Sequence, residues 1–359
     1  MSGRTDRAPG PATSCGIVKP PRLRPGDLVG VVAPSGPVTS RRAEVEAGMR
    51  CLEEYGFRVR EGEHLWAREG IRAGSREEQL ADLHAMFSDP EVQAIFCATG
   101  GITAITLVDG LDYDLIARHP KAFIGMSDVT ILQAALLSRA GLVSFHASGL
   151  AEGLGSPDAE REGPHLLRLL TDPEPPGPLP EWAGAVRLVR GSVDRAVRGS
   201  GDGAGRGRMG GPVQGGAGGV GHGRHEVHVS GRLVGGCWNC MLHLLGTPYW
   251  PPTDGAILFL EGVNLATSAV LRGLTQLRLA GALDGVAALL FGHMEGCFQD
   301  RPSPAEGLAL AVEHALGDLD LPVCQTEAFG HCVPNVTLPV GAVAAIRDGR
   351  LVLEEGAVV

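Results

Sequence analysis

One serine of the chain lies where a nucleophile could be exposed. In segment 121–130, a short apolar run ends at Gly125, Ser127 and Asp128 follow, and 131–137 is apolar with helical spacing. This pattern predicts a strand, a sharp turn and a helix, with the Ser127 hydroxyl over the first free N–H groups of the helix. Those donors are what a developing oxyanion needs. A simpler interpretation is that Ser127 or Asp128 only caps the helix, because both residue types are favoured there.

A nucleophilic serine also needs a base, and the base needs an acid that orients it. We expect His331 to be the base, because it lies in a loop after an apolar segment, and His293 is the main competitor among twelve histidines. We expect Glu261 to be the acid, since it closes the otherwise apolar strand 256–260. The order serine, glutamate, histidine is also that of α/β-hydrolases.

The elements around Ser127 predict a parallel sheet with helices on both faces, because strands and helices alternate. The expected strands are 27–33, 57–59, 94–98 and 122–125, and the expected helices are 40–55, 76–87, 104–108 and 131–137. Ligands of such sheets bind at the carboxyl ends of the strands. Both the Gly100-Gly101 turn and Ser127 are expected at that edge.

A second α/β unit is predicted after a change of composition. It has expected helices at 238–245, 270–280 and 305–316, strands at 256–261 and 285–291, and short strands at 338–341 and 350–354. The fold class is therefore α/β: a Rossmann- or flavodoxin-like N-terminal domain, and a C-terminal α/β domain with a β-rich, barrel-like end.

The predicted boundaries are a disordered lead at 1–21, an N-terminal domain at 22–171 that carries the nucleophile, a flexible linker at 172–230, and a C-terminal domain at 231–359 that carries the acid and the base. The linker begins with prolines and then has 13 glycines in the 25 positions 199–223. Such a segment buries too little apolar surface to offset its ordering entropy.

Composition narrows the function. The net charge of −10 argues against a general nucleic-acid binder. No apolar run approaches the roughly 20 residues that cross a bilayer, and the N-terminus lacks the apolar region of a signal peptide, so we expect a cytoplasmic protein.

Cys237 and Cys240 form a C-x-x-C pair, with His243 as a third candidate zinc ligand. Without a second pair, buried core thiols are the preferred interpretation.

A series of motifs resembles the LD-carboxypeptidase family of serine peptidases, which includes the microcin C immunity proteins. The matching stretches are, in order, Leu23-Arg24-Pro25-Gly26-Asp27, 32–35, Gly100-Gly101, 111–114, 120–121, Ile124-Gly125-Met126-Ser127-Asp128-Val129-Thr130, 141–146, Gly235-Gly236, 245–248, 258–261, Phe329-Gly330-His331 and 337–341. Outside the linker, the resemblance spans about residues 22 to 355. It implies Ser127 as nucleophile, Glu261 as acid and His331 as base. The implied oxyanion hole is formed by the backbone N–H groups of Asp128 and of the Gly100-Gly101 turn.

The resemblance implies hydrolysis of an amide next to a free carboxylate through an acyl-enzyme, with no metal or organic cofactor. The implied substrate is the L,D-bond of a murein tetrapeptide, which releases D-alanine; a peptidyl-nucleotide antibiotic of the microcin type is the alternative. Thr99, Ile102 and Cys237 stand where the family often has Arg, Tyr and Asn. These departures leave open a catalytically silent protein that binds a small peptide or conjugate, and a homodimer is also left open.

Overall fold

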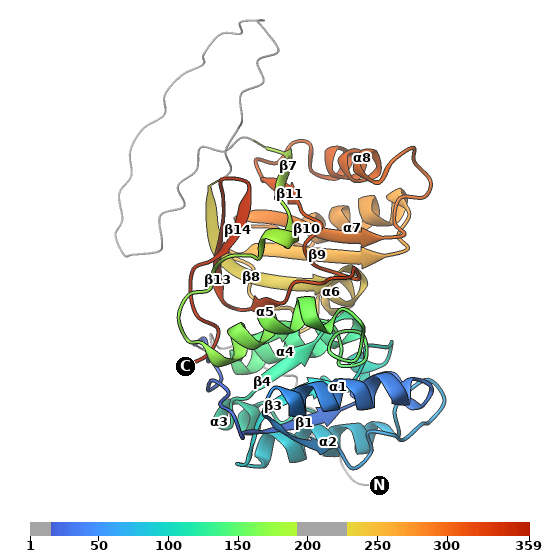
Figure 1. The fold of residues 1–359 in the computed structure, drawn as a ribbon. Helices are drawn as coiled ribbons and strands as arrows, with labels where there is room; N and C mark the ends of the chain where they lie inside the picture. Colours follow the sequence, from blue (N-terminus) through green and yellow to red (C-terminus); the bar gives the residue numbers. More distant parts are fainter. Residues whose placement is uncertain (1–15, 192–227) are drawn as a thin grey trace, which may run out of the picture.

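Two sheets, each with helices packed against it, form the framework of the protein (Figure 1). The computed structural model describes residues 16–191 and 228–359. In Figure 1 the N-terminal unit lies below, in blue to green, and the C-terminal unit lies above, in yellow to red. Helices α4 and α5 lie at the level where the two units meet.

The first sheet has six strands in the order β12-β5-β4-β3-β1-β2. Its strands are β1 (Leu28–Val32), β2 (Arg58–Glu61), β3 (Val92–Cys97), β4 (Ala122–Gly125), β5 (Ser144–His146) and β12 (Leu338–Val340). The first five strands run parallel, in the flavodoxin-like order 2-1-3-4-5. This confirms the predicted parallel sheet. Strand β12 comes from the C-terminal part of the chain and pairs with β5 in the antiparallel direction.

Helices cover both faces of this sheet, which is why its central strands β1 and β4 are apolar throughout. They are η1 (Thr39–Arg41), α1 (Arg42–Glu54), α2 (Arg76–Ser88), η2 (Ala104–Thr106), α3 (Tyr113–Arg118), η3 (Ser127–Val129), α4 (Thr130–Ala140) and α5 (Ala159–Thr171). Helix α2 begins with a capping box in which Ser75 and Glu78 satisfy each other's backbone N–H groups. Helix α4 ends at Gly141, whose φ of 67° is one that glycine adopts at little cost.

The second sheet has eight strands in the order β6-β14-β13-β8-β9-β10-β11-β7. Its strands are β6 (Gly177–Pro178), β7 (Arg187–Arg190), β8 (Val229–Cys237), β9 (Ile257–Val263), β10 (Ala288–Glu295), β11 (Val323–Gln325), β13 (Val343–Arg347) and β14 (Arg350–Leu353). Strands β8 to β11 are parallel, and the others pair antiparallel. The helices of this unit are η4 (Glu181–Ala183), α6 (Trp238–Leu244), α7 (Thr267–Leu279) and α8 (Pro304–Leu316). Of the predicted β-rich end, the strand at 338–341 is β12 of the first sheet, whereas the strand at 350–354 is β14, which forms a hairpin with β13 and extends the second sheet. Strands β6 and β7 are its two edges in the described part of the chain, so the sheet is open there instead of closing into a barrel.

The predicted linker at 172–230 needs a correction at its start. Strand β6 pairs with β14, and β7 pairs with β11, so residues up to 191 belong to the second sheet. Prolines are compatible with an edge strand, because its outer N–H groups need no partner in the sheet. The rest of the predicted linker, 192–227, lies outside the described residues. Residues 1–15 of the predicted lead also lie outside the described residues. Val18, farther along the predicted lead, is part of the fold, because its N–H donates to the Gly141 oxygen at 2.8 Å.

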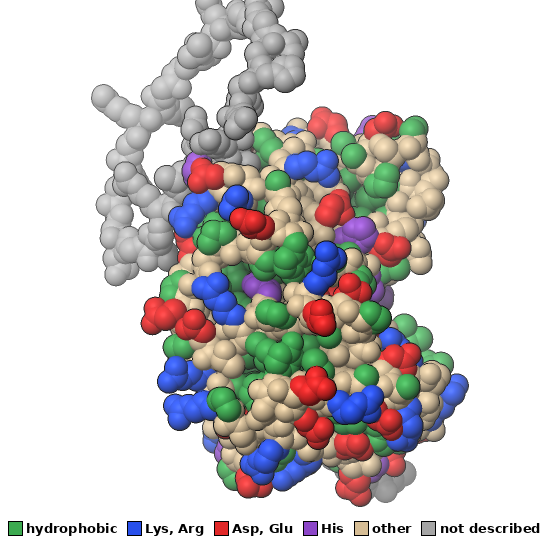
Figure 2. Space-filling model, viewed as in Figure 1, with side chains coloured by type: hydrophobic (Ala, Val, Ile, Leu, Met, Phe, Trp, Pro, Cys, Tyr) green, Lys and Arg blue, Asp and Glu red, His purple; other side chains and the backbone are tan. Residues whose placement is uncertain are grey.

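The surface gives no sign of a single charged face in the view of Figure 2. Acidic and basic side chains are interspersed over both units there, with hydrophobic side chains around the level where the units meet. Within residues 16–191 and 228–359, no helix is long and apolar enough to span a membrane.

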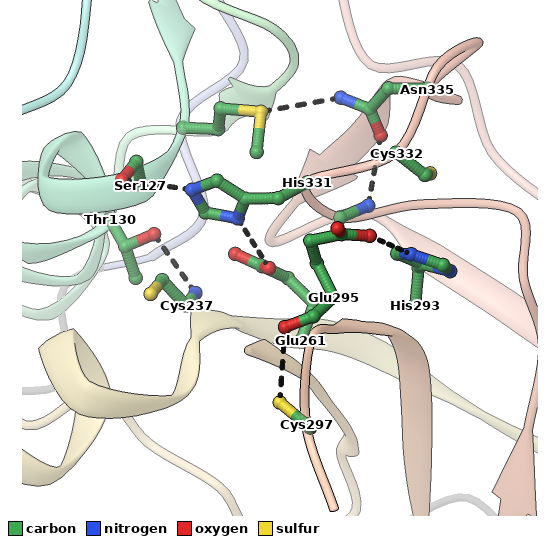
Figure 3. Close-up of polar contacts among 12 residues, drawn as sticks. Ser127, Thr130, Cys237, Glu261, His293, Glu295, Cys297, His331, Cys332 and Asn335 are labelled. Atoms are coloured by element: carbon green, nitrogen blue, oxygen red, sulfur yellow. Dashed lines mark hydrogen bonds and ion pairs between the residues drawn. The ribbon is translucent and has the colours of Figure 1, made fainter. Parts of the chain in front are cut away.

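The units touch directly behind the turn that carries Ser127. The backbone N–H of Cys237 donates to the Thr130 hydroxyl oxygen at 3.1 Å (Figure 3). A Cβ on Gly236 would lie 2.5 Å from the Thr130 side chain. Only a glycine therefore lets the end of β8 approach the first turn of α4 this closely.

Candidate active site

Ser127 lies in the sharp turn between β4 and α4, as the sequence pattern predicts. Its φ is 60°, a left-handed conformation that costs a non-glycine residue about 1–3 kcal/mol. A short 3₁₀ turn, η3, begins at this residue and leads directly into α4. The strained turn holds the hydroxyl at the end of a buried strand and beside the first N–H groups of a helix.

His331 connects Ser127 to Glu261 (Figure 3). The Nε2 atom of His331 lies 3.1 Å from Ser127 Oγ, and its Nδ1 lies 2.7 Å from Glu261 Oε2. Because a carboxylate accepts at Nδ1, that nitrogen carries the proton, and Nε2 is free to accept the proton of the serine hydroxyl. The structure thus brings together all three residues expected from the sequence, from β4–α4, β9 and the loop after β11.

The surroundings of His331 change its protonation. Burial lowers the pKa of His331, but the hydrogen bond and charge of Glu261, with smaller contributions from Glu152 and Glu295, outweigh burial and raise the pKa above its ordinary value of 6.5. Glu261 itself is completely buried, whereas 28% of the His331 side chain is exposed. The histidine can therefore reach a substrate while its acid partner is shielded from water, an arrangement that suits a general base.

The loop that carries His331 is held by Asn335, a residue that sequence reasoning missed. Asn335 is 2% exposed, and its Oδ1 accepts from the Gly330 N–H at 3.0 Å. Its Nδ2 donates to Ser148 Oγ at 3.1 Å, on the N-terminal unit. Gly330 has a φ of 125°, and a Cβ there would lie 2.9 Å from Glu261 Cβ. A glycine is needed at this position because the backbone next to His331 approaches Glu261 so closely.

Helix α5 of the N-terminal unit grips the same loop. Glu162 Oε1 accepts from the Asn335 N–H at 2.8 Å, and His165 Nε2 donates to the Thr337 oxygen at 3.0 Å. Both side chains are buried. Since Ser127 and His331 belong to different units, these contacts set the distance between them.

The backbone after β3 lies against Ser127. A Cβ on Gly100 would lie 2.7 Å from Ser127 Cβ and 3.5 Å from the Asp128 nitrogen. The Asp128 carboxylate accepts from the Ser35 hydroxyl and from the Ala104 N–H. It therefore ties the loops after β1 and β3 to the start of α4. The Gly100-Gly101 turn and the Asp128 N–H are thus next to Ser127, where an oxyanion hole would have to be.

A pocket of about 570 Å³ opens over Ser127 and His331. Its volume is within the range of small-ligand sites. Its walls are Gly101, Ile102, Ile105, Asp128, Ile131, Cys237, Trp238, Asn239, Cys240, His243, Gly262 and Val263. The walls are mainly apolar, with Asn239 and His243 as exposed polar side chains on α6.

The two alternative sites from the sequence do not share this geometry. His293 binds Glu327 through Nδ1 at 2.6 Å and Glu295 through Nε2 at 2.8 Å, so both ring nitrogens have carboxylate partners instead of a serine. Cys237 and Cys240 line the pocket as buried thiols. A hydrogen bond with Cys237, burial and the charges of Asp128 and Glu261 raise the pKa of Cys240 well above 9.0. This is the opposite of what a zinc-binding or redox thiolate needs.

No metal cluster accompanies these residues: in the part of the chain that the structure describes, no group of three or more His, Cys, Asp and Glu side chains could hold a metal ion.

Comparison with known proteins gives a consistent result. Residues 29–147 match the LD-carboxypeptidase N-terminal domain, and residues 230–346 match the LD-carboxypeptidase C-terminal domain. The chain is 30% identical to the "probable murein peptide carboxypeptidase" of Bacillus subtilis over 94% of this chain and 95% of that protein. It is 29% identical to the murein tetrapeptide carboxypeptidase of Pseudomonas aeruginosa over 90% and 94% of the two chains. It is 26% identical to the microcin C7 self-immunity protein of Escherichia coli over 90% and 91%.

Solved structures share the fold. A protein of Bacillus anthracis described as similar to the microcin immunity protein superposes with a TM-score of 0.76 at 24% identity, over 94% of this chain and 99% of that one. The muramoyltetrapeptide carboxypeptidase of Oxalobacter formigenes superposes with a TM-score of 0.69 at 24% identity, over 92% and 98%.

Proposed function

The chain belongs to the LD-carboxypeptidase family and is a serine-type carboxypeptidase, and we propose that Ser127, His331 and Glu261 are its catalytic triad. The observation that carries this proposal is the unbroken series of hydrogen bonds from Ser127 Oγ through His331 to the buried Glu261. The reaction is hydrolysis of an amide bond next to a free carboxylate, through an acyl-enzyme.

In the first step, Ser127 Oγ attacks the scissile carbonyl carbon while His331 Nε2 takes the hydroxyl proton. The carbonyl oxygen becomes an oxyanion, which accepts hydrogen bonds from the N–H of Asp128 and from the Gly100-Gly101 turn. The C–N bond then breaks, and His331 gives its proton to the leaving amine, which departs as the free amino acid. Glu261 stabilises the imidazolium form of His331 throughout this step.

The second step releases the acyl group. His331, neutral again, takes a proton from a water molecule that attacks the ester on Ser127. The same donors hold the second oxyanion, and collapse returns the proton to Ser127 Oγ and frees a carboxylate product. No oxidant, metal or organic cofactor takes part in either step.

We propose the L,D-bond of a murein tetrapeptide as the substrate, with D-alanine as the leaving group. This chain matches more than nine-tenths of the length of two relatives that are named for murein peptides. The pocket over Ser127 also has room for a short peptide. The similarity to the microcin C7 self-immunity protein, over 90% of this chain, favours a peptidyl-nucleotide conjugate as the second candidate.

The test is to incubate the wild type and Ser127→Ala with an L,D-tetrapeptide and with aminoacyl-nucleotide conjugates, and to identify products by mass spectrometry. Ser88→Ala is the matched control, because Ser88 is exposed at the end of α2. We expect the wild type and the control to release D-alanine from the tetrapeptide and Ser127→Ala to release none. Cleavage of the conjugates alone would select the second substrate, and full turnover by Ser127→Ala would refute the triad.

A cytoplasmic location and a homodimer stay predictions. Cell fractionation and sedimentation of the purified protein decide them.

A further inference from the structure

His146, the last residue of β5, is a buried histidine that the proposed mechanism does not use. Its exposed fraction is 0%, and neither ring nitrogen has a hydrogen-bond partner among the described residues. The ring packs edge-on against Phe259, with the ring centroids 5.5 Å apart and an interplanar angle of 68°. A buried imidazole with two unsatisfied nitrogens costs free energy, so it calls for an explanation.

Its location is next to the catalytic acid. Phe259 and Glu261 are two residues apart on β9, and side chains at that spacing project from the same face of a strand. The ring that packs on Phe259 is therefore on the side of the sheet from which the Glu261 side chain extends. The electrostatics agree, because the charges of both Glu261 and His331 act on His146.

The ring is neutral at ordinary pH. Burial lowers the pKa of His146 to about 4, the negative charge of Glu261 opposes this, and the positive form of His331 adds to it. A neutral imidazole has one N–H donor and one acceptor nitrogen. A neutral His146 can therefore donate a hydrogen bond to a carboxylate without placing a second positive charge beside it.

Glu261 needs such a donor. Its Oε2 accepts from His331, but its Oε1 is buried without a hydrogen-bond partner in the described part of the chain. A carboxylate bound at one oxygen only can rotate about its last side-chain torsion, and that torsion is broad. The unsatisfied donor of His146 and the unsatisfied acceptor of Glu261 thus occur in the same buried region, and one bridging contact would satisfy both.

We propose that His146 is a positioning residue that acts through Glu261: its ring N–H donates to Glu261 Oε1 through one buried water, and this bridge fixes the carboxylate in the orientation that accepts from His331. Buried waters commonly join polar groups of this kind and are part of the structure. The proposal rests on the triad given under Proposed function. His146 touches no substrate, so its effect belongs to the chemical step and not to binding.

The decisive variants of the full-length protein are His146→Phe and His146→Gln. Phenylalanine keeps an aromatic ring against Phe259 and removes both unsatisfied nitrogens, so a purely structural role predicts a stable and active variant. Our proposal instead predicts a stable variant with kcat lowered about 10- to 100-fold and KM unchanged. Glutamine retains an N–H donor and should keep kcat within about threefold of the wild type. Equal kcat for wild type and His146→Phe would overturn the proposal.

A second measurement separates this proposal from the proposed function. The rate at which a fluorophosphonate probe labels Ser127 reports on the activated serine without any peptide substrate. We expect His146→Phe alone to be labelled more slowly than the wild type. In a protein that already carries Glu261→Gln, adding His146→Phe should leave the labelling rate unchanged. Independent, multiplying effects of the two substitutions would show that His146 does not act through Glu261. If His146→Phe does not fold, His146→Leu is measured in the same way and judged by the same outcomes.

The outcomes also distinguish the two failures. A wild type that is labelled but does not cleave the tetrapeptide contradicts only the substrate, and the labelling rates still test His146. A wild type that is neither labelled nor active overturns the triad and this proposal together.

Discussion

Replacing Gly100 by alanine should disable the oxyanion site. The new Cβ would lie 2.7 Å from Ser127 Cβ and 3.1 Å from Ser127 Oγ, whereas real Cβ atoms essentially never approach another heavy atom within 3.0 Å. Gly100 does not have a positive φ, so alanine can adopt its backbone conformation. The substitution therefore acts through this contact and not through backbone strain.

The size of the effect follows from the displacement that the contact demands. Moving the two Cβ atoms from 2.7 Å to the 3.4 Å at which ordinary van der Waals contact begins requires a shift of 0.7 Å. A misplacement of about 1 Å at a catalytic group can cost roughly 100-fold, and loss of one oxyanion donor costs about 100- to 1000-fold in kcat. We expect kcat/KM to fall by about 100- to 1000-fold, or about 3–4 kcal/mol of transition-state stabilisation.

The assay is the initial rate of D-alanine release from an L,D-tetrapeptide, with thermal unfolding measured on the same preparations. Gly16→Ala is the matched control, since among the described residues, apart from its chain neighbours, no heavy atom lies within 4 Å of its Cβ position. The control should match the wild type in both measurements. A Gly100→Ala protein that unfolds at the wild-type temperature and keeps kcat/KM within threefold would refute our placement of the oxyanion site.

Three further predictions concern ionisation and the loop of the base. Because His331 must be neutral to accept a proton and its pKa is raised above 6.5, kcat/KM should rise with pH through a value above 6.5; a rate already at its plateau at pH 6 would contradict this. The pKa of His146 falls from 6.5 to about 4 on folding, so between these values the unfolded chain binds a proton that the folded chain does not. The free energy of unfolding should fall by about 3 kcal/mol as pH drops through this window, and denaturant titrations of His146→Phe should lack that part of the loss. Asn335→Ala removes the acceptor of the Gly330 N–H and should lower kcat about 10- to 100-fold with a smaller change in KM; an unchanged kcat would show that the loop holds its position without Asn335.

Much of the first unit could be predicted from the sequence because its signals are local. A buried strand that stops at Gly125, followed by a serine and a helical apolar run, contains the whole turn within about fifteen residues. The same holds for the acid at the end of β9, where a carboxylate in an apolar strand is conspicuous. These features depend on residue types and spacing, which are visible without the fold.

The support of the base could not be predicted, because its partners are distant in the chain. Asn335 and Glu162 are 173 positions apart, and their residue types occur in many loops and helices. A strand is expected at 338–341, but the pairing of β12 with β5 of the first sheet could not be predicted, and the two-residue β6 is too short to show a period. From the sequence, His146 is only the last residue of the stretch 141–146 that resembles the family; its two nitrogens without a partner become visible only in the structure.

The placement of β12 has a consequence for biosynthesis. The segment from Gly330 to Val340 places His331, the proposed base, beside Ser127 and then adds β12 to the sheet from which Ser127 projects. During synthesis, Ser127 therefore emerges 204 residues before His331, the residue proposed to take its proton. If the proposed triad is correct, a product truncated before Gly330 contains Ser127 but lacks His331, and we expect it to have no hydrolase activity.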